Sequence, residues 1–403
     1  MLGIERVRGV IDSRGRIDPP ARSVLIAACV LTLCIVPIRS DALTASWASP
    51  VAAPLASDPV AAAPGPRQEE PAVNLAAFNV YANTMTGSMS PAVAGMPERV
   101  YVPNSASGSV DVIDPATFTV VSHYAVGPIP HHVAPAWDLH HLYVDTEGMW
   151  SLTVIDPMTT QVTGRIPVSD PYNLYFTPDG TMAVVVAERL HRLDFYDPQR
   201  WQLRKSVFIP WLGVDHLDFT ADGHYLLAST EYSGVLVKVD ITTMQIAGSL
   251  RVGGLPVDVR LAPDGSVFYV ANQGRSGVSV IDPVSMQEVD FIHTGRGAHG
   301  LQISRNTRFL YVSNRYEGSI SVVDFATRQV AATWHIGGSP DMLQVSPDGS
   351  QLWASGRFDG SVYVVDTQSG LLLHRIRVGG QPHGLCYFPN VGQYSLGHNG
   401  VYR

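Results

Sequence analysis

The sequence predicts an all-β protein, a seven-bladed β-propeller with four-stranded blades. Three observations support this prediction. One strand motif recurs seven times at nearly constant spacing, an extra strand follows the last repeat, and the 403-residue chain is rich in Gly and Pro (36 and 29) but only 15% charged. This composition favours short strands joined by tight turns over long surface helices.

The recurring motif is an alternating strand that ends in aspartate. Its first copy spans 110–114 and its seventh spans 362–366, and consecutive closing aspartates lie 41 to 43 residues apart. Seven copies at one period indicate a repeat architecture. Most of the closing aspartates precede Pro or Thr, so we expect them to form turns by accepting hydrogen bonds from backbone amides. They are Asp114, Asp156, Asp197, Asp240, Asp282, Asp324 and Asp366.

Each repeat has the same internal order. A Pro-Asp-Gly turn precedes a strand such as 269–272, a Gly-containing turn leads to the marker strand, and a fourth strand such as 329–336 follows. A Gly-Gly-x-Pro connector such as 253–256 carries the chain to the next repeat. Four strands in about 42 residues are typical of one propeller blade, whereas the coils of a β-solenoid are usually shorter.

The two ends of the repeat array predict how the ring closes. The first copy lacks the inner strand that should precede Tyr101, and the last copy is followed by an extra strand at 384–388. Pairing of this strand with the first repeat would complete one composite blade and remove exposed sheet edges. We therefore expect seven blades over about residues 99–390.

The repeat resembles the YVTN family of β-propeller repeats, of the YncE-like type. The resemblance rests on Tyr269-Val270-Ala271-Asn272, on Tyr311-Val312-Ser313-Asn314, on the marker strands and on the connectors, and it covers most of the chain. The middle copies depart from the motif at 184–187 and 227–230. The resemblance implies a secreted, periplasmic or surface protein. Related propellers include lactonases and the haem-binding domain of a nitrite reductase, so the fold alone does not choose a function.

The N-terminal region predicts export. Residues 1–45 contain an apolar run, 23–38, flanked by arginines and followed by small residues that suit a signal peptidase, so they form a signal peptide or a membrane anchor. A lipobox-like sequence around Cys29 leaves a lipid anchor open as a third possibility. We expect a Pro/Ala-rich linker over 46–72, an extension packing on the propeller over 73–98, and the propeller over 99–403.

Charge and cysteine content limit the partners and cofactors that the protein is expected to bind. The formal net charge of −8 makes nucleic acid an unfavourable partner. Cys386 is the only cysteine outside the apolar N-terminal run, and the chain contains neither a CxxC zinc pair nor a CxxCH haem attachment motif. Cys386 is therefore interpreted as a small core residue.

One position in each repeat, just after the connector proline, should face the mouth of the central channel. Three histidines in seven such positions suggest a transition-metal site for zinc, copper or iron, made by His131, His299, Asp341 and His383. His132 and His216 lie one residue further along. A polar channel lining, an organic ligand or acid–base chemistry remain alternatives. The seven residues are His131, Tyr172, Asp215, Val257, His299, Asp341 and His383.

A second position in each repeat should form the rim of the same mouth. Its acidic members fall on consecutive blades and its arginines on two others, an arrangement that could orient a dipolar ligand or a charged partner loop. Solvated loop charges are the alternative. These residues are Ser105, Glu147, Glu188, Glu231, Gln273, Arg315 and Arg357.

The sequence therefore favours an exported binding protein whose channel mouth takes a small molecule, a metal ion or a partner protein. The second hypothesis is a propeller enzyme, lactonase- or lyase-like, that uses the same His and Asp residues. The third is a structural envelope module. No Ser or Cys nucleophile occupies a recognisable elbow, so no catalytic residue is assigned.

Overall fold

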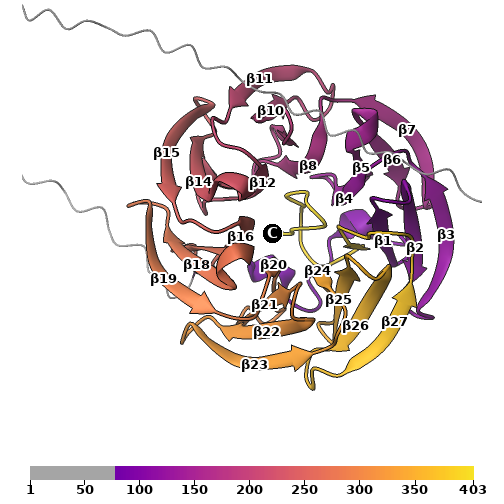
Figure 1. Ribbon diagram of the computed structural model, residues 1–403. Coiled ribbons are helices and arrows are strands. Elements are labelled where there is room, and N and C mark those ends of the chain that lie inside the picture. Colours follow the sequence, from indigo (N-terminus) through magenta and orange to yellow (C-terminus); the bar gives the residue numbers. More distant parts are fainter. Residues whose placement is uncertain (1–77) are drawn as a thin grey trace, which may run out of the picture. The chain divides into compact units, whose positions relative to one another are not determined.

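The computed structural model describes residues 78–403, which form a ring of seven four-stranded antiparallel sheets around a central channel (Figure 1). The predicted fold class and blade number are confirmed. The predictions for residues 1–45 and 46–72, and for the first residues of the 73–98 extension, lie outside the described residues. None of the helical segments from residue 78 onward is long or apolar enough to cross a membrane.

The strands follow the order expected for a propeller, from the channel outward within each blade. The innermost strands are β28 (Cys386–Phe388), β4 (Pro130–Pro135), β8 (Pro171–Phe176), β12 (Val214–Phe219), β16 (Pro256–Leu261), β20 (Ala298–Ile303) and β24 (Pro340–Val345). The second strands are β1 (Arg99–Asn104), β5 (Leu142–Thr146), β9 (Ala183–Ala187), β13 (Tyr225–Thr230), β17 (Phe268–Asn272), β21 (Phe309–Asn314) and β25 (Gln351–Gly356).

The third and outermost strands complete each sheet. The third strands are β2 (Ser109–Asp114), β6 (Ser151–Asp156), β10 (Arg192–Tyr196), β14 (Val235–Asp240), β18 (Gly277–Asp282), β22 (Ser319–Asp324) and β26 (Ser361–Asp366). The outermost strands are β3 (Thr119–Ala125), β7 (Gln161–Pro167), β11 (Leu203–Phe208), β15 (Gln245–Arg251), β19 (Gln287–His293), β23 (Gln329–His335) and β27 (Leu372–Arg377). Short 3₁₀ turns are η2 (Ala82–Thr84), η3 (Pro91–Val93), η4 (Glu147–Met149), η5 (Glu231–Ser233) and η6 (Gln273–Arg275).

The ring closes as the sequence predicts. β28 pairs antiparallel with β1, with Tyr101 opposite Cys386 and Arg99 opposite Phe388. The C-terminal strand thus supplies the inner strand of the first blade. Cys386 is fully buried in this closure, in agreement with its interpretation as a core residue.

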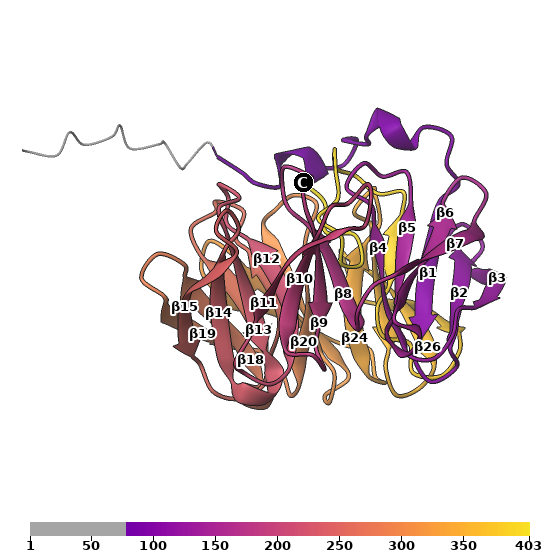
Figure 2. The same cartoon turned by 90° about the horizontal axis from the view of Figure 1, so that it is seen from above.

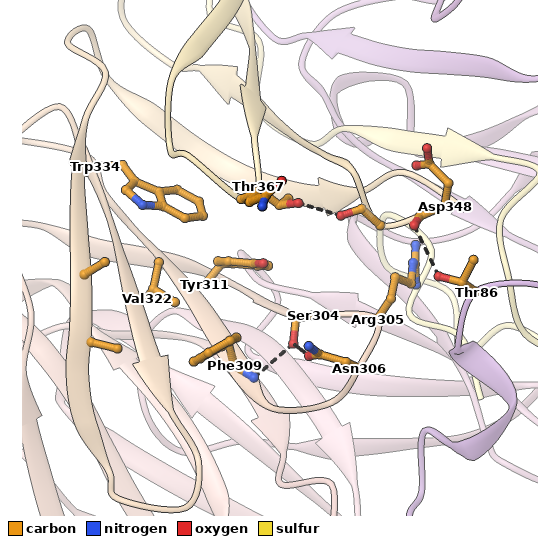
Figure 3. Close-up of a pocket in the computed structure, with 14 residues that line it drawn as sticks. Thr86, Ser304, Arg305, Asn306, Phe309, Tyr311, Val322, Trp334, Asp348 and Thr367 are labelled. Atoms are coloured by element: carbon orange, nitrogen blue, oxygen red, sulfur yellow. Dashed lines mark hydrogen bonds between the residues drawn. The ribbon is translucent and has the colours of Figure 1, made fainter.

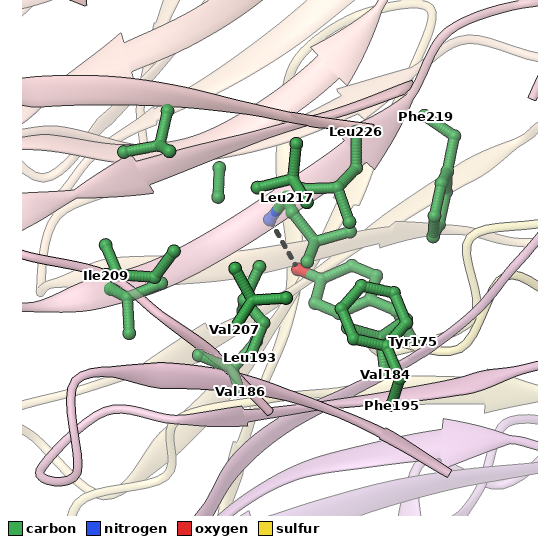
Figure 4. Close-up of a cluster of buried hydrophobic side chains, with 14 of the residues drawn as sticks. Tyr175, Val184, Val186, Leu193, Phe195, Val207, Ile209, Leu217, Phe219 and Leu226 are labelled. Atoms are coloured by element: carbon green, nitrogen blue, oxygen red, sulfur yellow. Dashed lines mark hydrogen bonds between the residues drawn. The ribbon is translucent and has the colours of Figure 1, made fainter. Parts of the chain in front are cut away.

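Apolar packing between neighbouring sheets makes the core. The inner three strands of each blade are largely buried on both faces, and the outermost strands are largely exposed. Figure 4 shows one such interface, where Tyr175 and Phe195 of one blade face Leu217 and Phe219 of the next. The Leu217 amide donates a hydrogen bond of 3.1 Å to the Tyr175 hydroxyl and ties the two sheets together.

The seven closing aspartates form turns, as expected from the sequence. Each accepts a hydrogen bond from a backbone N–H two or three residues further along, at 2.7–3.0 Å. These turns lie between the third and outermost strands and have no part in the channel.

The two faces of the ring differ. The inner strands begin at the face that carries the connectors and η4 to η6, which we call the mouth face, and end at the Pro-Asp-Gly turns, which we call the turn face. Residues 78–98 lie on the turn face together with the C-terminal residues (Figure 2). There the Val80 amide donates to the Pro263 carbonyl at 2.9 Å and the Tyr81 hydroxyl donates to the Leu261 carbonyl at 3.0 Å.

A β-bulge near the start of β4, β8, β12, β16, β20 and β24 shifts the register against the second strand. In β4 the register passes from Pro130–Thr146 to Val133–Val144, so that His131 and His132 together oppose only Asp145. A bulge locally breaks the strict alternation of side chains. Consecutive residues therefore reach the channel from one strand.

The residue opposite the bulge is serine in three blades and aspartate in one. Ser229, Ser313 and Ser355 each accept a hydrogen bond from a bulge amide, at 3.2, 2.8 and 3.1 Å. Asp145 takes the same place in its blade, fully buried, and neither carboxyl oxygen has a hydrogen-bond partner among the described residues. Burial raises the pKa of Asp145 well above its usual range.

We expect Asp145→Ser to raise the free energy of unfolding at pH 7 by about 1–3 kcal/mol, because it removes a buried polar group without partners. The raised pKa means that the folded state keeps a proton that the unfolded chain releases above about pH 4. Stability is therefore lost as pH rises, and the gain from the substitution should be smaller at pH 5 than at pH 7. Urea unfolding at both pH values measures it.

The reverse change, Ser313→Asp, is the matched control and should destabilise the protein with the same pH dependence. Equal stability of wild type and Asp145→Ser at pH 7 would contradict the interpretation.

Candidate functional site

The bulges arrange the channel residues in two layers. The mouth layer consists of the seven residues predicted from the sequence to face the channel mouth, and all of their side chains are buried, with at most 8% of each residue exposed. The deep layer consists of the next residue of each strand: His132, Asn173, His216, Asp258, Gly300, Met342 and Gly384. The structure thus brings together the residues that the repeat spacing places in the mouth, but it leaves little open space among them.

Within the mouth layer, His131 is engaged on both sides. Its Nδ1 lies 3.0 Å from Nδ1 of His383, and its Nε2 lies 3.0 Å from Oε2 of Glu147. Oε1 of Glu147 in turn lies 2.8 Å from Nε of Arg189. Burial lowers the pKa of His131 despite the carboxylate beside it. Because both ring nitrogens have partners, His131 offers no free lone pair for an ion.

Arg315 occupies the other side of the mouth layer. Its Nε donates to Oδ1 of Asp341 at 2.9 Å, and its terminal nitrogens contact Asp341, His299 and the Gln273 side chain. Burial alone would raise the pKa of Asp341, but Arg315 and His299 hold it below its usual range. Burial and Arg315 together lower the pKa of His299 to about 4.

The Arg315 contact decides what this side of the mouth can hold. One ligand atom each of His299, Asp341 and His383 lie within 4.8 Å of one another, a spacing compatible with an ion. However, the guanidinium already neutralises Asp341 and would repel a second cation. The predicted quartet of His131, His299, Asp341 and His383 is therefore close in space, but its donors are bonded to Glu147 and Arg315 as well as to one another.

The predicted acidic wall of the rim carries less charge than the sequence suggests. Burial and the neighbouring carboxylate of Asp215 raise the pKa of Glu188 to about 8 and that of Glu231 to about 7, and burial raises that of Asp215 to about 7. Opposite them, Arg357 donates to the Ser105 hydroxyl at 3.2 Å. The acidic side of the mouth thus shares protons near neutral pH and would gain charge when a cation approaches.

Three histidines form a cluster in the deep layer, directly against the mouth layer, where the rings of His132 and His383 have centroids 4.7 Å apart. They are His132 of β4, His216 of β12 and His398 from the C-terminal segment, all with no exposed surface. One ring nitrogen from each lies within 4.8 Å of those of the other two. The deep layer therefore contains a buried group of three imidazoles that the repeat pattern alone does not reveal.

His398 reaches this place on a hairpin that inserts into the channel from the turn face. Residues 393–403, the C-terminal hairpin, fold back on themselves, with the Leu396 amide donating to the Val401 carbonyl at 2.7 Å. The hairpin also pairs with the inner edge of β8, where the His398 amide donates to the Leu174 carbonyl at 2.9 Å. In Figure 1 this yellow segment lies at the centre of the ring.

Each of the three deep histidines has a polar neighbour at Nδ1. Nδ1 of His132 lies 3.1 Å from Nδ2 and 3.3 Å from Oδ1 of Asn399, and Nδ1 of His398 lies 2.9 Å from Nδ2 and 3.1 Å from Oδ1 of Asn173. Nδ1 of His216 lies 2.7 Å from Oδ1 of Asp215 without forming a hydrogen bond. The three Nε2 atoms are buried and have no hydrogen-bond partner among the described residues. A ring whose Nδ1 donates to the amide oxygen of its neighbour keeps its Nε2 lone pair for a metal ion, as in metal-binding histidines.

Sequence reasoning identified two of these three histidines only as neighbours of the mouth positions and missed His398. The tip that carries it reads Gly397-His398-Asn399-Gly400, a polar turn after the last strand of the ring. The one sequence feature that marks His398 is this pair of glycines around a histidine and an asparagine beyond the last repeat. It indicates a turn but not where the turn lies in the fold.

A larger cavity lies elsewhere, between the β20–β23 and β24–β27 blades near the turn face. Its volume is about 420 Å³. Trp334, Tyr311 and Phe309 line one part of it, and Ser304 and Asn306 are hydrogen-bonded to each other at another (Figure 3). This cavity is a groove between packed blades. It contains no convergent set of unpartnered polar groups, so we do not treat it as the functional site.

Comparison with known proteins identifies the family. The YNCE-like beta-propeller profile matches residues 70–391. The chain belongs to the YncE-like β-propeller family. The resemblance inferred from the repeat motifs is thereby confirmed.

Solved structures with the same fold are distant in sequence. A functionally unknown protein from Desulfotomaculum acetoxidans DSM 771 is 16% identical, with a TM-score of 0.64 over 72% of this chain and 98% of that one. Hydrazine synthase of Kuenenia stuttgartiensis is 18% identical, with a TM-score of 0.56 over 63% and 88%. The dihydro-heme d1 dehydrogenase NirN in complex with DHE is 16% identical, with a TM-score of 0.56 over 71% and 74%. No curated protein sequence matches this YncE-like chain. At these identities the likeness concerns the fold alone.

We expect Arg315→Gln to cost about 3–5 kcal/mol of stability at pH 7, because it leaves the Asp341 carboxylate buried without its cation. The lowered pKa of Asp341 means that this contribution is present above about pH 4, the value for an unfolded aspartate, and is lost as pH falls below it. Urea unfolding at pH 7 measures the loss. Arg357→Gln, on the more exposed side of the mouth, should cost less than about 1 kcal/mol. Similar losses in both variants would disprove the assignment.

Proposed function

We propose that this YncE-like propeller is a transition-metal-binding protein whose ion lies in the deep layer of the channel, between His132, His216 and His398. The observation that carries the proposal is a group of three buried imidazoles, each with one ring nitrogen within 4.8 Å of those of the other two and with an Nε2 atom that has no hydrogen-bond partner among the described residues. Imidazole nitrogen suits zinc, copper and iron. Three histidines with a fourth position left for an outside ligand are a known arrangement for zinc.

The protonation state of the cluster supports the same function. Burial lowers the pKa of His216 to about 4, and burial and the neighbouring imidazoles hold the pKa values of His132 and His398 well below their usual range. The three rings are therefore neutral at pH 7, the form that binds metals. An ion at 2.0–2.1 Å from each nitrogen holds them about 3.4 Å apart. Small ring rotations from the present spacing would suffice.

The surroundings of the cluster suit a cation more than an organic substrate. Asp258, whose Oδ1 lies 3.8 Å from Nε2 of His398, is at the edge of the cluster, and the same oxygen accepts a hydrogen bond of 2.9 Å from the buried Arg260, which balances its charge. The hairpin fills the channel on the turn face, so the approach is from the mouth face, past Glu188 and Glu231. The mouth-layer groups are bonded to one another and nearly buried, which supports a small ligand over a lactone.

Export remains part of the proposal. The apolar run at 23–38 and the linker after it support a location outside the cytoplasm, secreted, periplasmic or at the cell surface, with a membrane tether as one form. An extracytoplasmic metal-binding propeller would take its ion from that compartment.

Purified wild-type protein should bind one equivalent of Zn²⁺ or Cu²⁺ in isothermal calorimetry, with elemental analysis confirming the stoichiometry. His216→Ala and His398→Ala should each weaken binding by roughly 100-fold or more, because each removes one of three ligands. Circular dichroism checks that the variants are folded.

Two histidine variants serve as matched controls. His140→Ala, at an exposed histidine, should leave affinity unchanged, and His299→Ala should retain one equivalent because it lies in the mouth layer. Metal-free wild type after exposure to both ions would refute the proposal, and loss of binding in His299→Ala with retention in His216→Ala would move the ion to the mouth layer.

Asn399→Ala should weaken Zn²⁺ binding by about 10- to 100-fold, because it removes the side chain that is hydrogen-bonded to Nδ1 of His132 without removing a ligand. Asn306→Ala, whose side chain lies in the groove between blades, is the control. An unchanged affinity in Asn399→Ala would show that the Asn399 contact does not orient His132.

A further inference from the structure

The proposed ligands come from two parts of the chain with different supports. His132 and His216 belong to inner strands that are paired within their blades. His398 belongs to the C-terminal hairpin, which is joined to the ring by few backbone hydrogen bonds. An ion bound to all three would therefore connect the hairpin to the ring.

The base of the hairpin is anchored independently of the histidines. Nη2 of Arg403 lies 3.0 Å from Oδ1 of Asp218, and the Tyr394 ring stacks on Trp137 with centroids 5.3 Å apart. Leu396 and Val401 are buried against the β8–β11 and β12–β15 blades. These contacts hold the base at the turn face and leave the tip to be positioned by what it meets in the channel.

The tip has an unfavourable backbone. All four of its residues have positive φ, +88° at Gly397, +28° at His398, +54° at Asn399 and +88° at Gly400. Left-handed conformations cost non-glycine residues about 1–2 kcal/mol each. A Cβ at Gly397 would lie 2.3 Å from the Leu174 carbonyl oxygen, so the tip fits the channel closely. Contacts inside the channel must offset this cost.

Without an ion, the contacts of the inserted tip are incomplete. Insertion buries the His398 ring beside those of His132 and His216, and the Nε2 atoms of all three have no hydrogen-bond partner among the described residues. A buried polar group without a partner costs about 1–3 kcal/mol. One ion satisfies all three at once, so it favours the inserted tip over a withdrawn one.

We propose that metal binding and insertion of the C-terminal hairpin are one linked equilibrium: the ion locks the hairpin tip in the channel, and the inserted tip completes the ion's site. This proposal rests on the proposed metal site and concerns its regulation. Linkage requires reciprocity: the factor by which the ion favours the inserted tip equals the factor by which insertion raises metal affinity. A change that lowers the population of the inserted tip must therefore lower metal affinity in proportion to that population.

Hydrogen exchange followed by mass spectrometry tests whether the ion locks the hairpin tip in the channel. It compares full-length protein with and without saturating Zn²⁺. Amides of residues 396–401, including the His398 amide bonded to Leu174, should exchange at least tenfold more slowly with Zn²⁺. Peptides covering β17 and β18, which hold no proposed ligand, are the internal control and should not change.

Hairpin variants that keep all three histidines test whether the inserted tip completes the ion's site. Arg403→Gln and Tyr394→Ser each weaken the base, and each should lower Zn²⁺ affinity by about tenfold or more in calorimetry, with faster exchange at the tip. Arg377→Gln, an exposed arginine on β27, is the matched control. Tyr394→Ser keeps the test valid if Arg403→Gln does not fold.

The outcomes separate the two proposals. The linkage is disproved, and the metal site retained, if both folded hairpin variants bind Zn²⁺ with wild-type affinity. The same conclusion follows if Zn²⁺ does not slow hydrogen exchange at the tip. Absence of Zn²⁺ binding to wild type in the calorimeter overturns the metal site itself, before any exchange is measured.

Discussion

The pairing of β28 with β1 is the constraint on which the rest of the molecule depends. Three residue pairs, from Arg99–Phe388 to Tyr101–Cys386, turn an open row of blades into a ring. The closure also brings the two ends of the repeat array into register at the channel, where the Gly384 amide donates to the His131 carbonyl at 2.8 Å. His383 and His131, 252 residues apart in the chain, become neighbours for this reason.

Closure also decides where the remaining residues go. An inner strand runs from the mouth face to the turn face, so the chain leaves β28 beside the axis on the turn face. The shortest path from there is back into the channel, and Gly384 and Gly397 provide the room because a Cβ on either would meet Asn399 or Leu174. The C-terminal hairpin is thus a direct consequence of the way the ring is sealed.

The two layers of the channel differ in electrostatics, although they come from adjacent residues of the same strands. In the mouth layer, Arg315 and Glu147 supply counter-charges, and the histidines are bound to them. In the deep layer, three neutral imidazoles meet; the Nδ1 atoms of His132 and His398 contact asparagine side chains, and none of the three Nε2 atoms has a hydrogen-bond partner among the described residues. The bulges place both layers on the same strands, so a shift of one residue separates a network paired with Arg315 and Glu147 from a candidate metal centre. The YncE-like fold, which structures as different as NirN and a hydrazine synthase share, does not itself imply either.

The sequence by itself determined the architecture, because blade formation is local and periodic. The regular spacing of the closing aspartates fixed the number of blades, and the missing and extra strands at the ends fixed the closure. The same periodicity placed His131, His299, Asp341 and His383 around one mouth. The blade number, the closure and the position of these side chains at the mouth follow from the place of each residue within its repeat.

Only the tertiary structure decided which of these residues are free to bind. Arg315 and Glu147 were visible as rim charges, but their contacts with Asp341, His299 and His131 depend on side-chain directions across blades. The raised pKa values of Glu188 and Glu231 depend on burial, which the repeat pattern does not give. His398 lies outside the repeat, and its meeting with Asn173, 225 residues earlier, depends on the hairpin folding back through a ring that must first be closed.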